Sequence, residues 1–249
     1  MKILNVLFLL FFTGTALSQN LKDEKGRKQG AWHKNYPNSQ TLEYKGQFKD
    51  DQPVGKFIYN YPDGRLKMVI VHDQVTKRSE AFMYYDSGKL MSYGIYRSQK
   101  KDSIWTQYGV NNNISSKETY KNGVQEGRTV VYFASEDNSN LLKIGKEMYY
   151  SKGQLHGTYT EYFITGTVRK KANYVNGKLQ GACISYQPDG KILMEENYKE
   201  GKKHGFFRTF DDTGKEIGRK FYQYGNEYTQ EQTDKYIQQC KAKGKNPNE

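Results

Sequence analysis

The chain has 249 residues, and 39 Lys and Arg against 27 Asp and Glu give it a formal net charge of +12. Only 35 % of the residues are hydrophobic, yet 14 % are aromatic and 22 are tyrosines. This composition excludes simple disorder, which lacks aromatic residues, and argues against a thick aliphatic core. Many Tyr, Thr and Gly residues with only five prolines favour short strands joined by tight turns.

The N-terminus differs from the rest of the chain. Lys2 precedes an apolar run over residues 3–12, and small residues lead to Ala16-Leu17-Ser18. This order is typical of a secretory signal peptide, and the apolar run is shorter than the roughly 20 residues of a membrane span. We therefore predict a signal peptide over residues 1–18, cleaved after Ser18, and an exported protein that is periplasmic, cell-surface or secreted. An uncleaved anchor or a buried strand is the alternative.

Weaker copies of one sequence unit cover residues 30–150. Four opening or central motifs mark them, namely Gly30-Ala31-Trp32, Gly55-Lys56-Phe57, Ala81-Phe82 and Trp105, and a fifth copy opens at Gly127. Glu80 and Ser103 stand where two of these copies lack the opening glycine. The fifth copy is about six residues longer than the others, and the polar stretch 134–139 predicts a lengthened hairpin loop.

Three regular units follow, with a period of 24 residues. The repeated positions are the opening glycines Gly157, Gly181 and Gly205, the central glycines Gly166, Gly190 and Gly214, and the tyrosines Tyr174, Tyr198 and Tyr222. A fixed period of this length indicates a repeat architecture. Together with the five weaker copies, the regular units predict eight repeats.

Each unit has the pattern of a β-hairpin. In the seventh, residues 182–187 and 191–198 flank Pro188-Asp189-Gly190, and Asp-Gly favours a turn because both residues tolerate positive φ. The hydrophobic period is two rather than 3.6. The predicted fold is all-β, an elongated antiparallel meander of about eight hairpins over residues 19–228, roughly 75–80 Å long at a strand spacing of about 4.8 Å.

Tyrosines at equal positions of neighbouring units should lie in a row. Tyr174, Tyr198 and Tyr222 are predicted to pack on a half-buried sheet face, with glycines opposite that leave space for the rings. The alternative is that these rings stack on a ligand. If the sheet has a binding surface, its candidate residues are these tyrosines with nearby cations, in full Tyr174, Tyr198, Tyr222, Arg169, Lys171, Lys202 and Lys203.

Residues 229–249 are predicted to form a C-terminal helix and tail. Thr229 and Gln232 fit a capping box, and Tyr236, Ile237 and Cys240 would share one helical face. A helix over residues 230–243 would cover the exposed edge of the repeat sheet. Lys245 to Glu249 are expected to be frayed.

The chain has two cysteines, too few for a secreted fold stabilised by several disulfides. Cys183 lies at a strand position where neighbouring units have Tyr159 and Phe207, which predicts a small apolar filler. Cys240 lies in the predicted helix. The sequence leaves open whether the two cysteines form a disulfide or two free thiols.

The unit resembles the MORN repeat, in the bacterial variant of the YwqK-like antitoxin family. The resemblance rests on the Gly-x-aromatic opening (Gly157-Thr158-Tyr159), the centre Tyr186 to Lys191 and the ending Tyr174 to Lys178, and it covers about residues 26–226. It implies an elongated antiparallel sheet without catalytic residues. It also implies a role in protein scaffolding or, in some members, contact with membrane lipid.

Residue patterns for catalysis or metal binding are lacking. His156 and His204 both precede an opening glycine two units apart, so about 19 Å at four strand spacings separates them. One zinc ion cannot bind both, since each ligand must come within about 2.1 Å. His33 and His72 are expected at the surface. We predict no catalytic residue, no metal site and no cofactor.

The leading hypothesis is a non-enzymatic exported repeat protein whose extended sheet mediates protein–protein interaction or scaffolding. Removal of Lys2 with residues 1–18 would leave 38 basic and 27 acidic residues, a net charge of +11. This charge supports an alternative, the binding of anionic membrane lipid or polysaccharide through a basic, tyrosine-rich face. A second alternative is an antitoxin or immunity-type protein. Nucleic acid is not an expected partner.

Overall fold

The structure is a computed structural model and describes residues 19–134 and 142–248. The predicted signal peptide lies outside the described residues, so its cleavage remains a prediction. Most of the loop predicted in the fifth unit also lies outside them. No helix in the described part of the chain is long and apolar enough to cross a membrane.

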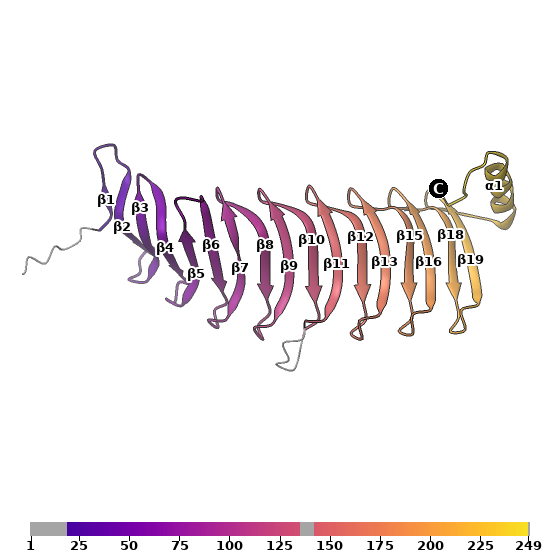
Figure 1. Cartoon of the computed structure of the whole chain (residues 1–249), viewed down its shortest axis with the longest axis horizontal. Helices are drawn as coiled ribbons and strands as arrows, with labels where there is room; N and C mark the ends of the chain where they lie inside the picture. Colours follow the sequence, from indigo (N-terminus) through magenta and orange to yellow (C-terminus); the bar gives the residue numbers. More distant parts are fainter. Residues whose placement is uncertain (1–18, 135–141, 249) are drawn as a thin grey trace, which may run out of the picture.

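The described chain forms one open antiparallel sheet followed by one helix (Figure 1). The strands are β1 (Leu21–Lys22), β2 (Lys28–Asn35), β3 (Leu42–Lys49), β4 (Gln52–Asn60), β5 (Leu66–His72), β6 (Arg78–Tyr84), β7 (Leu90–Arg97), β8 (Lys100–Tyr108), β9 (Ile114–Lys121), β10 (Val124–Tyr132), β11 (Ile144–Ser151), β12 (Gln154–Tyr162), β13 (Val168–Val175), β14 (Lys178–Leu179), β15 (Gly181–Tyr186), β16 (Ile192–Lys199), β17 (Lys202–Lys203), β18 (Gly205–Phe210), β19 (Glu216–Gln223) and β20 (Asn226–Tyr228). Helix α1 spans Gln230–Ala242.

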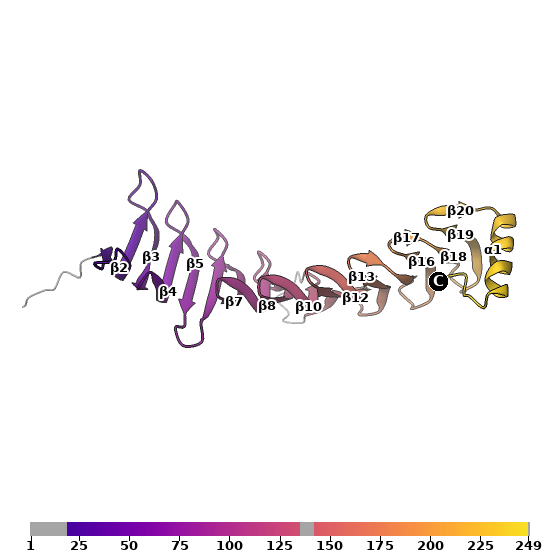
Figure 2. The same cartoon turned by 90° about the horizontal axis from the view of Figure 1, so that it is seen from above.

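The predicted meander of eight hairpins is confirmed. Each strand pairs with its neighbour along the chain, and β14 with β15, like β17 with β18, is one strand interrupted by a single residue. Counted this way, β2 to β19 form eight hairpins, while β1 and β20 are short additional strands at the two ends. The sheet is a single layer that twists along its length (Figure 2).

The two long edges of the sheet carry different turns. Within each unit the chain reverses through a turn such as Tyr61 to Arg65, in which the Tyr61 N–H donates to Arg65 O and only Gly64 has positive φ. Asp-Gly therefore forms a turn here in which only the glycine has positive φ, although both residues tolerate it. The aspartate instead accepts hydrogen bonds, as Asp189 does from the Lys191 N–H at 3.1 Å, and only the glycine is left-handed.

Most turns between units, along the opposite edge, do have two residues with positive φ, whereas the turn between β5 and β6 has only Lys77. Asn176 and Gly177 have φ of 48° and 79°, as a hairpin turn of this type requires. The Gly177 N–H also donates to the carbonyl of Leu155 in the preceding unit at 2.8 Å. Equivalent bonds from Gly123, Gly153, Gly201 and Gly225 link each turn to the unit before it.

The opening glycines form bulges in the strands. Gly157 has φ of 100°, and the pairing of β11 with β12 shifts register beside it. Ser103, which replaces the glycine in the fourth unit, keeps this conformation with φ of 60°. Glu80 does not, and β5 pairs with β6 without a register shift. When a residue other than glycine occupies the opening position, it therefore either adopts positive φ, as Ser103 does, or the bulge is absent, as at Glu80.

The sheet has two faces that differ in packing. The face carrying Trp32, Phe57, Trp105, Tyr159, Tyr174, Tyr198, Phe207 and Tyr222 is called the ring face, and the other is called the opposite face. On the ring face, the most buried large side chains are Phe57 and Trp105, 1 % and 0 % exposed. Lys45, Val71, Ile104 and Lys171 are on the opposite face.

Helix α1 closes the C-terminal end of the sheet. The Thr229 and Gln232 side chains form the predicted capping box, and Tyr236 packs on Phe221 of β19 with ring centroids 5.4 Å apart. The tail is not frayed as expected, because Asn248 Oδ1 accepts the Phe206 N–H at 3.0 Å. The chain therefore folds back from α1 onto the start of β18.

Candidate functional site

The predicted tyrosine row lies on the ring face of the regular units. Tyr174 faces Gly157 across the strand pair, and its ring lies 5.7 Å from that of Tyr159. Phe207 lies 5.5 Å from the Tyr198 ring and 4.9 Å from the Tyr222 ring. The rings pack on one another with glycines opposite, as the packing interpretation predicted.

The hydroxyl groups of this row bind carboxylates of the same face. The Tyr159 hydroxyl donates to Glu161 at 2.5 Å, and the Tyr198 hydroxyl donates to Glu196 at 3.2 Å. Burial and these carboxylates raise the pKa of both tyrosines. Burial also raises the pKa of Glu161, but hydrogen bonds from Tyr159 and Lys146 outweigh it and leave that pKa lowered. Two tyrosine hydroxyls of the ring face are thus bonded to carboxylates within the sheet.

The predicted cations do not form one cluster with the tyrosines. Lys203 lies over the Phe207 and Tyr222 rings, 5.0 and 4.9 Å from their centroids. Lys171 pairs with Thr160 and Ile184 and is therefore on the opposite face, as is Lys202, which pairs with Lys199. The side-chain period of two in a strand separates residues that are close in sequence.

Arg169 belongs to a hollow of the ring face beside the tyrosine row. The hollow has a volume of about 750 Å³ and lies along the edge of the within-unit turns (lower edge in Figure 1). Its lining is apolar with a charged margin, namely Phe163, Tyr186, Pro188, Leu193, Met194 and Phe210 with Glu161, Arg169, Lys170, Ser185, Gln187 and Asp212. Arg169 adjoins Glu161 and contributes to lowering the pKa of that carboxyl.

The hollow exposes apolar side chains where the return strands bulge. Leu193 is the extra residue between the pairs Tyr186 with Ile192 and Ser185 with Met194, and it is 44 % exposed. Ile217, the equivalent residue of β19, is 65 % exposed. This hollow is not visible in the sequence, because its lining residues come from three units. The sequence signal that could have indicated it is the apolar residue three positions after the central glycine, Leu193 after Gly190 and Ile217 after Gly214.

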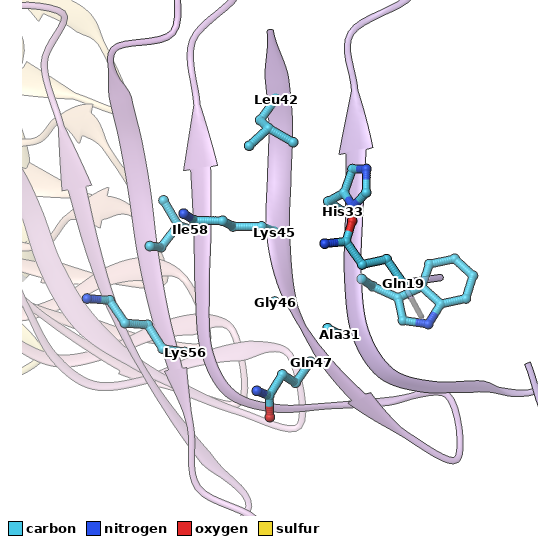
Figure 3. A pocket seen from close by; sticks show the side chains of 10 residues that line it. Gln19, Ala31, His33, Leu42, Lys45, Gly46, Gln47, Lys56 and Ile58 are labelled. Atoms are coloured by element: carbon cyan, nitrogen blue, oxygen red, sulfur yellow. The ribbon is translucent and has the colours of Figure 1, made fainter. Parts of the chain in front are cut away.

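A second open groove lies on the opposite face near the N-terminal end. It has a volume of about 450 Å³, and His33, Lys45 and Lys56 extend into it from β2, β3 and β4 (Figure 3). Ala31 and Ile58 line it as well. Its cations do not adjoin any of the predicted binding residues, which all lie in the regular units.

The histidines serve the turns between units. His156 Nδ1 accepts the Asn176 N–H, and His204 Nδ1 accepts the Tyr224 N–H, each at 3.4 Å. Gln180 does the same for Glu200 at 3.0 Å. His72 is half-buried and bonded to Ser79 at 2.8 Å, so its expected surface position is only partly correct.

The described residues hold little that could act as a reaction centre. No group of three or more His, Cys, Asp or Glu side chains in the described ranges could hold a metal ion. Glu195 binds Arg208 at 3.4 Å, whereas Glu196 binds Tyr198 on the ring face. Cys183 and Cys240 are free and buried, and Cys183 is the small filler that its repeat position predicted.

Comparison with protein families finds the MORN repeat variant at residues 155–176 and 179–200. Each matched segment corresponds to one hairpin, β12 with β13 and β14/β15 with β16. The resemblance seen in the sequence is confirmed for these two adjacent repeats, and the assignment to the antitoxin family stays a prediction. A comparison with curated proteins finds no match.

Proposed function

We propose that the protein is a non-enzymatic interaction scaffold, whose regular units bind a protein partner on the ring face. The observation that carries this proposal is the hollow beside the tyrosine row, in which an apolar lining meets charged residues at its margin. Aromatic residues, Met and Arg are enriched at protein interfaces, and their binding energy concentrates where such side chains lose water. A repeat sheet places this surface on a long, rigid support.

The partner contact is centred on Leu193 and Arg169. Leu193 offers 44 % of its surface, so a partner side chain can bury it without rearrangement of the sheet. Arg169 and Lys170 supply positive charge at the margin, and Glu161 and Asp212 balance it. A partner with an apolar anchor and a mixed, polar surround would fit this arrangement.

Site-specific photo-crosslinking tests the proposal. A photoreactive residue at Leu193 should form one specific adduct in extracts of the native host, competed by excess unlabelled protein. The matched control is the same residue at Lys171, which is exposed but on the opposite face of the neighbouring hairpin. Leu193→Asp in a chain with the crosslinker at Phe210, which also lines the hollow, should abolish the adduct. Equal labelling at both positions, or none at either, would contradict the proposal.

A second function is favoured by the charge of the edge that carries the turns between units. Lysines recur there in neighbouring units, namely Lys100, Lys101, Lys121, Lys152, Lys178, Lys202 and Lys203. Such a row would attract an anionic lipid surface or polysaccharide. Co-sedimentation with anionic vesicles should then fall as salt rises, and Lys178→Glu with Lys202→Glu should weaken it more than Lys45→Glu with Lys56→Glu.

The two functions differ in their dependence on salt and on Leu193. Binding through the hollow should survive moderate salt and be lost in Leu193→Asp. Binding through the lysine row should behave in the opposite way. An exported location, predicted from residues 1–18, would place either partner outside the cytoplasm, and N-terminal sequencing of the mature protein would test it.

A further inference from the structure

The opposite face of the looser units carries a continuous apolar row. Strand register places one residue from each of β4, β5, β6 and β7 side by side, namely Ile58, Val69, Phe82 and Tyr93. Lys45 on β3 and Thr106 on β8 are the next residues of the row at its two ends. Four strands at a spacing of about 4.8 Å give the apolar row a length of roughly 14 Å.

A second apolar row lies beside the first and is more exposed. It contains Val71, Ile95 and Ile104, and the exposed fractions of Val71 and Ile104 are 40 % and 54 %. The described chain forms a single layer here, so it places no second layer over these side chains (Figure 2). Together the two rows are called the apolar patch. Apolar patches with polar borders are typical of docking sites.

Helix α1 shows what covers apolar side chains at equivalent positions of the same face. Val71 and Ile104 correspond to Phe221 and Phe206 of the last unit. There α1 packs on the sheet, with the Tyr236 ring 5.4 Å from the Phe221 ring, and Phe221 is 2 % exposed. In the two units before it, these positions hold small or polar residues, namely Thr158, Asn173, Ala182 and Asn197. Large apolar residues at these positions are therefore associated with a covering helix.

Charged residues around the apolar patch are mainly basic. Lys45 and Lys56 extend into the groove at one end of the patch (Figure 3), and Lys117 continues the first row beyond its other end. Glu80 lies within the second row. Asp102, beside that row, pairs with an arginine of β7 at 3.6 Å. An acidic partner would thus be complementary to this surface.

We propose that the apolar patch binds an amphipathic α-helix of a partner protein, with acidic residues flanking its apolar stripe. A groove or face that takes up the apolar side of a helix is a recurrent mode of recognition. At a rise of 1.5 Å per residue, the 14 Å row matches about ten residues, or nearly three turns. The acidic residues would lie near Lys45 and Lys56.

A second copy of this chain does not supply such a helix. The apolar side of α1 is already packed on its own sheet, where Thr233 and Cys240 are each 6 % exposed. The apolar patch is also separate from the ring-face hollow, because the two lie on different faces and in different units. The inference is therefore independent of the proposed ring-face partner.

A displayed library of 18-residue helices tests the proposal. Each member has leucines at helical spacing, and Glu, Lys or Gln fills the other positions at random. Selection on the whole protein should enrich acidic members, and fluorescence anisotropy should show saturable binding of a selected peptide. Replacement of every Glu by Gln in that peptide should weaken binding at least about threefold at low salt. Enrichment of no helix, or equal enrichment of acidic and basic helices, would overturn the proposal.

Matched variants of the protein locate the binding surface. Val71→Lys should weaken the selected peptide at least about fivefold, as expected for an apolar contact at the centre of an interface. Val124→Lys is the control, since Val124 on β10 is 45 % exposed and lies outside the patch, and it should leave the dissociation constant unchanged. Leu193→Asp should also have no effect, which separates this site from the ring-face hollow. Equal weakening by Val71→Lys and Val124→Lys would overturn the site.

Other occupants of the apolar patch would give different results. If a second copy covered it, the native chain would sediment as a dimer and Val71→Lys as a monomer. If a lipid surface covered it, vesicles containing phosphatidylglycerol would compete with the selected peptide and would lose affinity for Val71→Lys. Either result would overturn the proposal. A monomer that binds the acidic peptide through Val71, without competition from vesicles, would support it.

Discussion

The five looser units at the N-terminal end and the three regular units near the C-terminal end pack their ring faces differently. In the looser units Phe57 and Trp105 are almost completely buried, at 1 % and 0 % exposure. In the regular units the equivalent ring-face position is held by Tyr159 and Phe207, which are half-buried, and by Cys183, which is buried. Tyr174 and Tyr198 are half-buried, and Tyr222 is 9 % exposed. On this face, the largest fully buried side chains therefore lie in the looser units.

Glycines in the middle of strands explain the difference. A Cβ atom on Gly94 would lie 2.2 Å from the Trp105 ring, and one on Gly46 would lie 2.4 Å from the Phe57 ring. Each ring occupies the space that the glycine of the preceding unit leaves. In the regular units Ala172 stands at the equivalent position and Cys183 packs near it. The junctions between units thus differ in which strand supplies the large side chain and which supplies the small one. This is expected where each unit contacts only its neighbours.

The largest predicted effect concerns Trp105. Trp105→Ala would leave a cavity over Gly94 and remove the indole hydrogen bond to Ile95 O at 3.1 Å, at a cost of about 3–5 kcal/mol in unfolding free energy. Cys183→Ala, at an equally buried position of a regular unit, should cost no more than about 1 kcal/mol. Urea unfolding of both variants checks this difference. Similar losses would show that the junctions are equally packed.

A smaller effect is expected when the glycine is changed. Gly94→Ala should destabilise the sheet by about 1–3 kcal/mol, because the new methyl group overlaps the buried Trp105 ring. Gly145→Ala is the matched control, since its Cβ would meet the Phe133 ring at an ordinary 3.5 Å and its φ is not positive. That variant should be neutral or stabilised by up to about 1 kcal/mol. In a Trp105→Leu background, Gly94→Ala should cost less unfolding free energy than it does in the native chain, because the smaller leucine leaves room for the methyl group.

The sequence allowed most of the fold to be predicted, because hairpin turns and a 24-residue period depend on local residue choice. It could not show that Glu80 removes a bulge or that Asn248 returns to β18, since each outcome depends on distant backbone contacts. The burial of Trp105 could not be predicted from the sequence either. It depends on the contact between Trp105 and Gly94, which is set by the register between strands of two neighbouring units.

The candidate site was predictable only in part, for a geometric reason. The tyrosine row follows from period and face, and the structure confirms its packing. The cations were grouped with it by proximity in sequence, but alternate strand residues point apart, so Lys171 and Lys202 lie on the opposite face. The position of Leu193 could not be predicted from strand alternation, because a bulge directs this side chain into the hollow.

In the turns between units, we expect a substitution that stabilises a looser unit and a corresponding one that destabilises a regular unit. Gln99 in the turn between β7 and β8 has φ of 63°, whereas Gly177 holds φ of 79° in the equivalent turn of a regular unit. Gln99→Gly should stabilise the looser region by about 1 kcal/mol, and Gly177→Ala should destabilise the regular region by a similar amount. Thermal unfolding of both variants measures the two shifts. A loss of stability in Gln99→Gly would mean that the glutamine makes contacts that outweigh its strain.

The smallest expected effect is a local dependence on pH at the end of the regular units. The pKa of His204 is lowered from its usual 6.5 by burial and by Lys199. The stability that the neutral ring confers is therefore complete above about 6.5 and declines as the pH falls toward the folded-state pKa. Protonation also removes the acceptor for the Tyr224 N–H. The ring packs on Tyr224, with ring centroids 4.8 Å apart. It also borders a pocket whose other described lining residues, namely Lys199, Gln223, Tyr236, Cys240, Lys245 and Asn246, include no carboxylate.

Amide exchange of α1, corrected for the intrinsic effect of pH, measures this opening. Protection of α1 should fall below about pH 6.5, while protection of β12 beside the exposed His156 should stay constant. His204→Gln should remove the pH step, because Gln180 makes the same turn bond in the preceding unit at 3.0 Å and does not titrate. A step that persists in His204→Gln would assign the dependence to another group. Its absence in the native chain would mean that α1 and the tail stay closed over a charged imidazole.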